Sequence, residues 1–300
     1  MKKIFFSLLI ASTTLFFSCG KDNDNNNNEN NGGGGGSSYN APSRHLSKAT
    51  YWDGYIDSYG DTVYCEYRFS WDGDHMTKID VYHKSSFERL DLTFNIEWDG
   101  DKVIKTTMNS PNMSPGNVTT FTYNGDQLVK SHSTYYGDDG EIESEVLYEY
   151  TNGKISQITY PDEYFPYPIE VTWDRTNIAT LSMLDRTMLE YTFDSKKNPL
   201  YLPMGVMNNC IIEGTFWEGV NNTIGYLFSL SSMTSGNPLS LLVSSWSENN
   251  IVKITNYDGS EIPIEYIYDG DYPISISRTF VYADEDKHTE THTIEFYYDD

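Results

Sequence analysis

The amino-acid sequence predicts an all-β domain built from a long run of antiparallel hairpins. A short unit recurs, consisting of an aromatic residue, an Asp-Gly or Asn-Gly turn and an aliphatic residue, often with Lys two places later. A period of 20–50 residues indicates a repeated supersecondary unit, and one tight turn in each unit indicates a β-hairpin. The aromatic residues stand at positions 71, 98, 123, 150, 173, 193, 217, 246 and 268. Nine such units predict about 18 strands.

Apolar and polar residues alternate in the segments before the turns. In the segment 92–98 every second residue is apolar, and the residues between them are Thr, Asn and Glu. A period of two is typical of a sheet with one buried and one wet face. Trp98, which ends this segment, is therefore expected in the core. No long helical periodicity follows residue 50.

The spacing of apolar residues changes after the turns. Met76 and Ile79 are three residues apart, and so are Ile251 and Ile254. A β-bulge between the two members of each pair would return both to the buried face, with the Lys between them pointing outward. A sheet buried on both sides at this level is the alternative. Residues 46–49 resemble the second half of a further unit.

Residues 1–18 are predicted to be a lipoprotein signal peptide. Two lysines precede an apolar stretch that is too short to span a membrane. The segment 15–19 resembles a lipobox, in which the small Ser18 precedes Cys19, so Cys19 is expected to carry the lipid. An ordinary signal peptide followed by an incidental Cys is the alternative.

Residues 19–40 are predicted to be a flexible tether, and residues 41–300 the repeated β-hairpin domain. The tether is rich in Asn, Asp and Gly and has too little apolar surface to offset its ordering entropy. The acidic residues after Cys19 resemble the signal that sends such lipoproteins to the cell surface. The predicted location is the outer membrane, with a lipid anchor and the domain facing the cell exterior.

The net charge bears on the class of partner, and the cysteine content bears on disulfide bonding. The formal net charge is −24, and nucleic-acid binding needs a basic surface, so no nucleic-acid partner is expected. Besides Cys19 the chain holds Cys65 and Cys210. An oxidising compartment permits a disulfide between them, but the sequence does not fix the pairing, and two free, buried thiols are the favoured interpretation.

The lipobox, the Asn/Gly tether and the recurring aromatic-Asp-Gly-Asp units together resemble a family of Bacteroidetes lipoproteins, the domain of unknown function family 4595, described as having a porin-like fold. The resemblance covers residues 46–300. It implies that the meander curls into a porin-like barrel and carries no catalytic residues. A β-sandwich and an open superhelical sheet are the alternatives. The apolar face is crowded with aromatic residues, where a lipid-facing wall would have Leu and Val, so a membrane-spanning barrel is not expected.

No catalytic residue, metal site or cofactor is predicted. The Asp residues are concentrated in turns, where they hydrogen-bond local backbone. His288 and His292 would lie about 13 Å apart on a strand, too far to share one zinc ion. The chain has no nucleophile-elbow, phosphate-loop or Cys-His motif in a plausible context.

Aromatic residues outside the strand register are the candidate binding residues, because Tyr and Trp serve as platforms for sugars and protein surfaces. They are Tyr135, Tyr136, Tyr164, Phe165 and Tyr167. Asp61-Thr62-Val63 matches a short O-glycosylation signal of exported Bacteroidetes proteins, with Thr62 as the acceptor. The predicted function is non-enzymatic: a surface lipoprotein that binds a glycan or another protein, or an envelope-associated barrel. A glycan-active hydrolase is the alternative.

Overall fold

The computed structural model describes residues 44–56, 62–84, 88–111, 113–137, 140–161, 167–199, 201, 247–281 and 289–299. Cys19, the signal peptide, the tether, Tyr164, Phe165 and Cys210 lie outside these ranges. Cys65 lies half-buried in a strand. The described residues form β-strands and turns and no helix, as the sequence predicted. They contain no helix long and apolar enough to cross a membrane.

In the part of the chain that the structure describes, seventeen strands follow one another. The first nine are β1 Leu46–Ile56, β2 Thr62–Asp72, β3 His75–Lys84, β4 Glu88–Asp99, β5 Lys102–Ser110, β6 Met113–Asn124, β7 Gln127–Gly137, β8 Gly140–Thr151 and β9 Lys154–Thr159. The other eight are β10 Ile169–Asp174, β11 Asn177–Met183, β12 Arg186–Lys197, β13 Asn249–Asn256, β14 Glu261–Pro263, β15 Glu265–Asp269, β16 Tyr272–Val281 and β17 Thr289–Tyr298.

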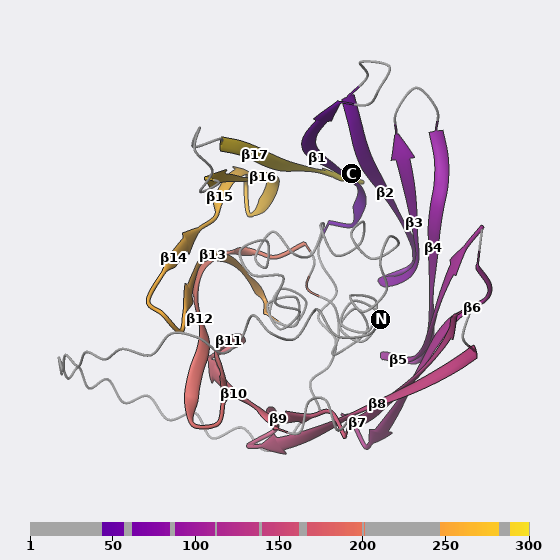
Figure 1. The fold of residues 1–300 in the computed structure, drawn as a ribbon, viewed down its shortest axis with the longest axis vertical. Helices are drawn as coiled ribbons and strands as arrows, with labels where there is room; N and C mark the ends of the chain where they lie inside the picture. The colour runs from indigo at the N-terminus through magenta and orange to yellow at the C-terminus, as the bar shows by residue number, and fades with distance from the viewer. Residues whose placement is uncertain are drawn as a thin grey trace, which may run out of the picture. The chain divides into compact units, whose positions relative to one another are not determined.

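The strands form one antiparallel sheet that curls into a nearly closed barrel (Figure 1). Each strand from β1 to β14 pairs with the next, and so does each strand from β15 to β17. The first strand also pairs with the last, through a ladder that runs from Leu46 opposite Tyr298 to Trp52 opposite Thr293. Between β14 and β15 only Ile264 intervenes, so one bent segment pairs first with β13 and then with β16. The predicted meander and barrel are therefore confirmed.

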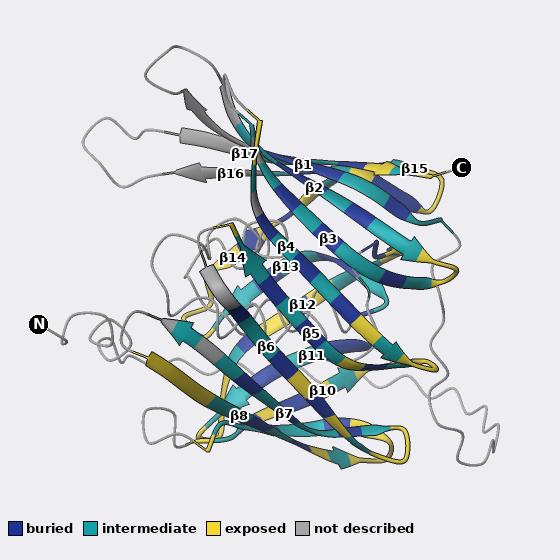
Figure 2. Cartoon of the chain, turned by 90° about the vertical axis from the view of Figure 1, so that its right-hand side faces the viewer, coloured by how far each residue is buried: buried dark blue, intermediate teal, exposed yellow. Residues whose placement is uncertain are grey.

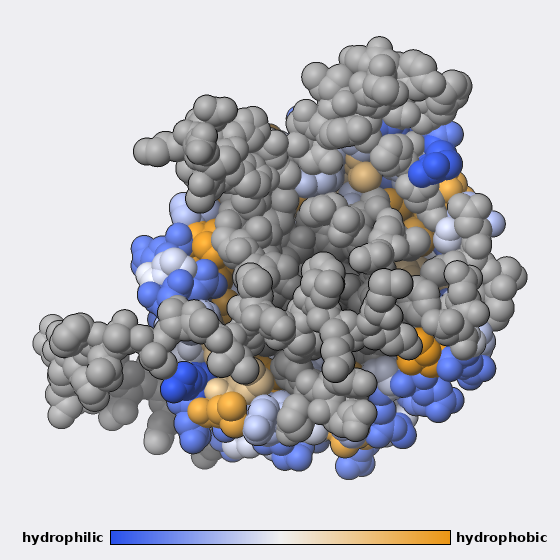
Figure 3. All heavy atoms as spheres, viewed as in Figure 1, coloured by the Kyte–Doolittle hydropathy of each residue, from blue (hydrophilic) through white to orange (hydrophobic). Residues whose placement is uncertain are grey.

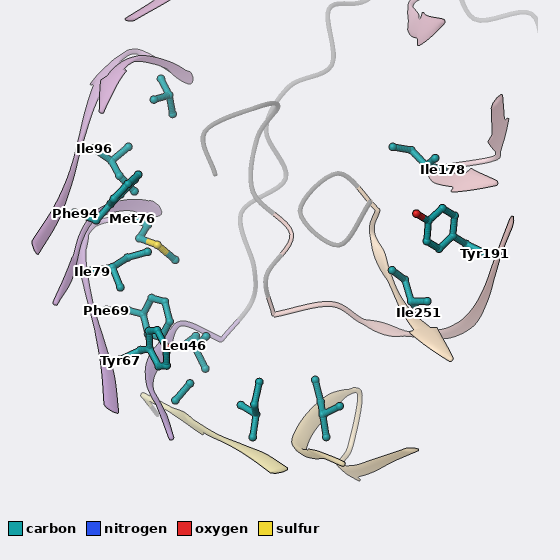
Figure 4. Close-up of a cluster of buried hydrophobic side chains, with 14 of the residues drawn as sticks. Leu46, Tyr67, Phe69, Met76, Ile79, Phe94, Ile96, Ile178, Tyr191 and Ile251 are labelled. Carbon is teal, nitrogen blue, oxygen red and sulfur yellow. The ribbon is translucent and has the colours of Figure 1, made fainter. Parts of the chain in front are cut away.

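Apolar side chains line the inner face of this barrel. Figure 4 shows the labelled buried residues, among them Tyr67, Phe94 and Tyr191, on the inner side of the ribbon. Buried and more exposed positions alternate along the strands (Figure 2), as the period of two predicted. In Figure 3 hydrophilic residues outline the periphery of the described part, while hydrophobic ones lie further in.

Charged pairs lie on the outer face, between neighbouring strands or along one strand. The nitrogen–oxygen distances are 2.6–2.8 Å. The pairs are Lys78–Asp80, Lys105–Glu97, Lys130–Glu145 and Lys253–Glu261. The outer face is therefore suited to contact with water.

The β-bulges predicted after the turns are present. The β2–β3 register shifts between Ser70 and Trp71, which leaves both Met76 and Ile79 fully buried. The β12–β13 register shifts in the same way opposite Ile251 and Ile254. An extra residue in one strand restores both apolar side chains to the same face. Each unit therefore buries the first aliphatic residue after its turn.

The repeated aromatic residues join each unit to the one before it. The indole N–H of Trp98 donates a hydrogen bond of 2.8 Å to the carbonyl of Met76. Equivalent bonds link aromatic residues to the aliphatic residue that opens an earlier strand; they are Trp71 to Leu46, Tyr123 to Val103, Trp173 to Ile155 and Tyr266 to Ile251. The ring of Trp98 is half-buried against the core and lies 4.4 Å from the ring of His75.

The barrel closes by completing a unit from the two ends of the domain. Tyr298 and Asp299 supply its first half, and residues 46–49 supply the second half that the sequence suggested. The hydroxyl of Tyr298 donates to the carbonyl of Pro273 at 2.7 Å, and the N–H of Asp299 donates to the carbonyl of His45 at 2.9 Å. Arg44 adds an ion pair with Asp269 and lies over the ring of Tyr298. The junction of β1 and β17, which we call the seam, thus has the same kinds of contact as the units around it.

The repeat is interrupted between β12 and β13. These strands pair directly, although residues 202–246, including the looser copies expected at Trp217 and Trp246, lie outside the described residues. Hydrogen bonds from side-chain amides and to a carboxylate connect the strands next to this interruption. Asp194 accepts bonds from the N–H of Lys196 and of Asn250, and Asn177 and Asn249 bond to each other. Two of the nine expected units, those at Trp217 and Trp246, therefore begin outside the described residues, and the described sheet has 17 strands.

Candidate functional site: the loop end of the barrel

The two ends of the barrel differ in their connections. One end, which we call the turn end, carries the tight turns that join β2 to β3, β4 to β5, β6 to β7, β8 to β9, β10 to β11 and β15 to β16. The opposite end, which we call the loop end, carries the connections that follow β1, β3, β5, β7, β9, β11, β13 and β16. Antiparallel pairing of successive strands places these two sets at opposite ends.

Half of the exposed large hydrophobic side chains among the described residues lie at the loop end. Four of the eight among the described residues lie there, namely Ile142, Tyr167, Leu184 and Tyr257, with exposed fractions of 46–62%. The other four are spread over the outer wall and the turn end; they are Ile104, Ile267, Ile274 and Tyr297. Single exposed hydrophobic residues are ordinary, but a group on one end of a domain indicates a contact surface.

The structure brings part of the predicted aromatic patch to this end. Tyr136 lies near the end of β7 and is half-buried, and its N–H donates to the side chain of Asn117 at 3.2 Å. Tyr167 precedes β10 and is 47% exposed. In the β7–β8 ladder Tyr135 pairs with Ile142, and Tyr136 pairs with Glu141.

Leu184 and Tyr257 are parts of the site that sequence reasoning missed. Leu184 lies in the two-residue turn between β11 and β12, and Tyr257 begins the turn between β13 and β14. The search for aromatic residues outside the strand register did not include an aliphatic residue in a turn. The signal that would have found Leu184 is the replacement of the usual Asn-Gly or Asp-Gly pair by Leu-Asp in a hairpin.

The charges around these tips are mainly acidic. Glu170, Asp185, Asp258 and Glu261 are exposed there. Hydrogen bonds from Ser260 lower the pKa of Asp258, so this carboxylate remains charged in neutral solution. The basic groups nearby are Arg186, which is exposed, and Lys253, which is paired with Glu261 at 2.6 Å.

A second cluster of charged side chains lies on the outer wall, and its members form ion pairs with one another. Glu66 accepts bonds from Arg68, and Arg68 also contacts Glu88 at 3.0 Å and lies 4.1 Å from the ring centre of Tyr82. Lys84 lies close to Glu88 and lowers its pKa. Both carboxyl pKa shifts resolved among the described residues, those of Glu88 and Asp258, are downward. The charges of this cluster are thus paired with one another on the outer wall.

Metal binding and glycosylation are the two remaining sites that the sequence analysis considered. Within the described residues, no group of three or more His, Cys, Asp or Glu side chains could hold a metal ion. His288 lies outside these residues. Thr62 is the first residue of β2, at the loop end. Its modification stays a prediction.

No family model and no curated protein matches the chain. Among solved structures, the chain is similar to a porin-like protein from Bacteroides vulgatus ATCC 8482, with 12% sequence identity and a TM-score of 0.39. The match covers 85% of this chain and 99% of that chain. The antiparallel barrel itself rests on the strand pairings described above, and membership of the lipoprotein family stays an expectation from the sequence motifs.

Proposed function

We propose that the chain is a non-enzymatic binding protein of the cell envelope, in which a barrel surrounded by water presents a contact surface at its loop end. The observation that carries the proposal is the distribution of exposed hydrophobic side chains. Four of the eight among the described residues lie at the loop end, at Ile142, Tyr167, Leu184 and Tyr257, while the other four are spread over the outer wall and the turn end, and the wall also carries ion pairs. This arrangement suits a module that holds a partner at one end.

The same distribution argues against a membrane pore. A barrel in a bilayer has an apolar outer band and a polar interior. Here the apolar side chains lie on the inner face, and charged side chains such as Lys105 and Glu97 lie outside. An ion pair in the hydrocarbon region would be costly. We therefore propose that the membrane connection is the lipid on Cys19 and the tether of residues 19–40, with the domain facing the cell exterior.

The location is tested by removing the lipid. The variant Cys19→Ala is expected to be released from membranes without detergent and to remain a folded β protein by circular dichroism. The wild-type protein should be lost from intact cells treated with protease. If the unlipidated variant needs detergent to stay folded, or if protease removes the domain only from lysed cells, this part of the proposal is wrong.

Binding is tested with a glycan array and with immobilised envelope proteins, using the unlipidated chain. The variant Tyr167→Ser should weaken binding to either class, whereas Asp101→Asn at the turn end should leave it unchanged. Both positions are exposed, so neither change should alter the fold. Equal binding by both variants would place the contact surface elsewhere.

Glycosylation of Thr62 is a separate proposal, since its three-residue signal also arises by chance. Intact-mass spectrometry of the protein from its native host should show an added glycan that Thr62→Ala removes. A mass difference that equals the substitution alone would rule it out.

A further inference from the structure

We propose that the β11–β12 tip, with Leu184 at its apex, is the anchor of a docking surface for a protein partner that presents an apolar pocket edged by basic side chains. The inference rests on the binding function proposed above and names the class of partner. It starts from the backbone of the tip.

Leu184 and Asp185 hold a backbone conformation that their side chains disfavour. Their φ angles are +53° and +59°. Turns with positive φ at both central residues strongly prefer Asn-Gly or Asp-Gly, because a side chain branching beyond Cβ crowds the backbone there. The chain uses the preferred pair in the turn between β8 and β9, where Asn152 and Gly153 have φ angles of +53° and +77°. The same conformation is therefore built once from preferred residues and once from Leu-Asp.

Nothing in the packing of the tip accounts for this choice. The side chain of Leu184 is 59% exposed, so it adds little to the core. Strain that burial does not repay is found mainly at functional sites. An exposed apolar side chain on a rigid hairpin tip can fill a pocket on another molecule at low entropic cost, as anchor residues of interfaces do.

The neighbours of Leu184 extend the tip into a surface. Tyr167 precedes β10, and Tyr257 follows β13. The strands β10 to β14 are adjacent in the sheet, and we call their ends at the loop end the arc. A spacing of about 4.8 Å between strands makes this arc roughly 20 Å wide. A standard interface covers about 800 Å² on each partner, so an arc of this width fits within one contact.

The charge of the arc selects the partner. Glu170, Asp185 and Asp258 are exposed around the apolar tips, and Arg186 is the exposed basic residue beside them. An acidic edge attracts a basic one and repels anionic lipid headgroups and acidic polysaccharides. Leu184 suits an apolar protein pocket, whereas Tyr167 and Tyr257 could contact either a protein or a sugar, so the leucine and the acidic edge decide between them. A protein with a basic edge is therefore the occupant that the arc favours.

Two substitutions separate a docking role from a structural one. Leu184→Asn installs a residue that tolerates the left-handed backbone, so the melting temperature of the full mature chain should rise by about 1–3 °C. Leu184→Met keeps an apolar tip as a matched control and should leave the melting temperature near that of the wild type. A fall in melting temperature for Leu184→Asn would show that the leucine stabilises the fold and would overturn the inference.

The partner is then tested by photo-crosslinking in intact cells of the native host. A photoreactive residue replaces Arg186 at the tip, and the same residue replaces Asp99 at the turn end as a control. We expect a polypeptide adduct at position 186 that is absent at position 99. Leu184→Asn should reduce this adduct about tenfold or more, Leu184→Met should retain it, and added salt should weaken it.

The other outcomes each decide against the inference. An adduct that lipid extraction or glycan cleavage removes would identify another class of partner. A polypeptide adduct that is unchanged by Leu184→Asn would mean that the tip is not the anchor. A third probe at Glu141, beside Tyr136, separates the two proposals. An adduct at 141 without one at 186 would overturn this inference alone, and no adduct at either position would overturn the binding function as well.

Discussion

The two ends of the barrel use the same hairpin geometry for different purposes. At the turn end, Gly holds the positive φ in most turns, as at Gly73, Gly100 and Gly125, although Arg175 holds it in the β10–β11 turn, and aromatic residues before the turns such as Trp98 and Tyr123 bond to a neighbouring unit. At the loop end, the β11–β12 turn places Leu184 in that strained region and exposes it. Of the described turns with two successive residues at positive φ, the one at the turn end has Asn-Gly and the one at the loop end has Leu-Asp.

This difference explains why repetition is a guide to stability rather than to function. Units at the turn end bury an aliphatic residue such as Met76, and many of them satisfy its carbonyl with an aromatic donor. Such contacts must recur if every unit is to be held to the next, so they produce a visible period. The residues of a contact surface need not recur in every unit. They can therefore be recognised where they replace the residues that the repeat usually has.

The largest effect is expected at the turn end, from Trp98→Ala. The substitution removes core packing and leaves the carbonyl of Met76 without its indole donor. Large aromatic-to-alanine changes cost about 3–5 kcal/mol, and the half-buried ring points to the lower part of this range. Glu97→Ala on the outer face should cost less than about 0.5 kcal/mol. Urea unfolding of both variants measures the difference, and equal small losses would mean that the aromatic contacts do not hold the units together.

Much of the fold could be predicted from the sequence, because its signals are local. The alternation in 92–98, the bulge between Met76 and Ile79, and the half unit at 46–49 all follow from short-range spacing. The closure by Tyr298 and the direct pairing of β12 with β13 could not be predicted, because they depend on which distant strands meet. At the site, Tyr136 and Tyr167 were recognised by residue type, whereas Leu184 required its backbone angle.

A second effect at the turn end concerns alkaline pH. Burial raises the pKa of Tyr123 to about 12, from about 10 in an unfolded chain. The folded state therefore keeps a proton that the unfolded state loses, so this stabilisation is full below pH 10 and is lost as the pH rises towards 12. Burial also raises the pKa of Tyr150, Tyr266 and Tyr298.

Unfolding free energies measured from pH 8 to pH 11.5 should fall steeply above pH 10. Tyr123→Phe should make the fall shallower, since one of the titrating groups is gone. Because the hydroxyl of Tyr123 donates to the carbonyl of Val103 at 2.8 Å, the variant should also be less stable at pH 8. A pH profile identical to that of the wild type would show that this tyrosine does not link folding to pH.

The seam offers a smaller effect with a closely matched control. Tyr298→Phe removes the hydrogen bond to the carbonyl of Pro273 and should cost about 1 kcal/mol. Tyr297→Phe, one residue away, removes a bond to Glu295 on the exposed outer face and should cost less than about 0.5 kcal/mol. Thermal unfolding of the two variants compares them directly. A larger loss for Tyr297→Phe would show that the last unit is held differently from the others.

The smallest effect compares the two turns of like geometry. Gly153→Asp puts a side chain at φ +77° in the turn end and should destabilise the domain by about 0.5–1 kcal/mol. Asp185→Gly makes the reverse change at φ +59° in the loop end and should stabilise it by a similar amount. Both positions are exposed, so differences in packing contribute little to either value. Opposite signs in urea unfolding would show that the β11–β12 turn carries backbone strain that the β8–β9 turn avoids. If Asp185→Gly destabilised the domain, the Leu-Asp turn would be a stabilising choice, and the contrast between the two ends would no longer point to a docking role for Leu184.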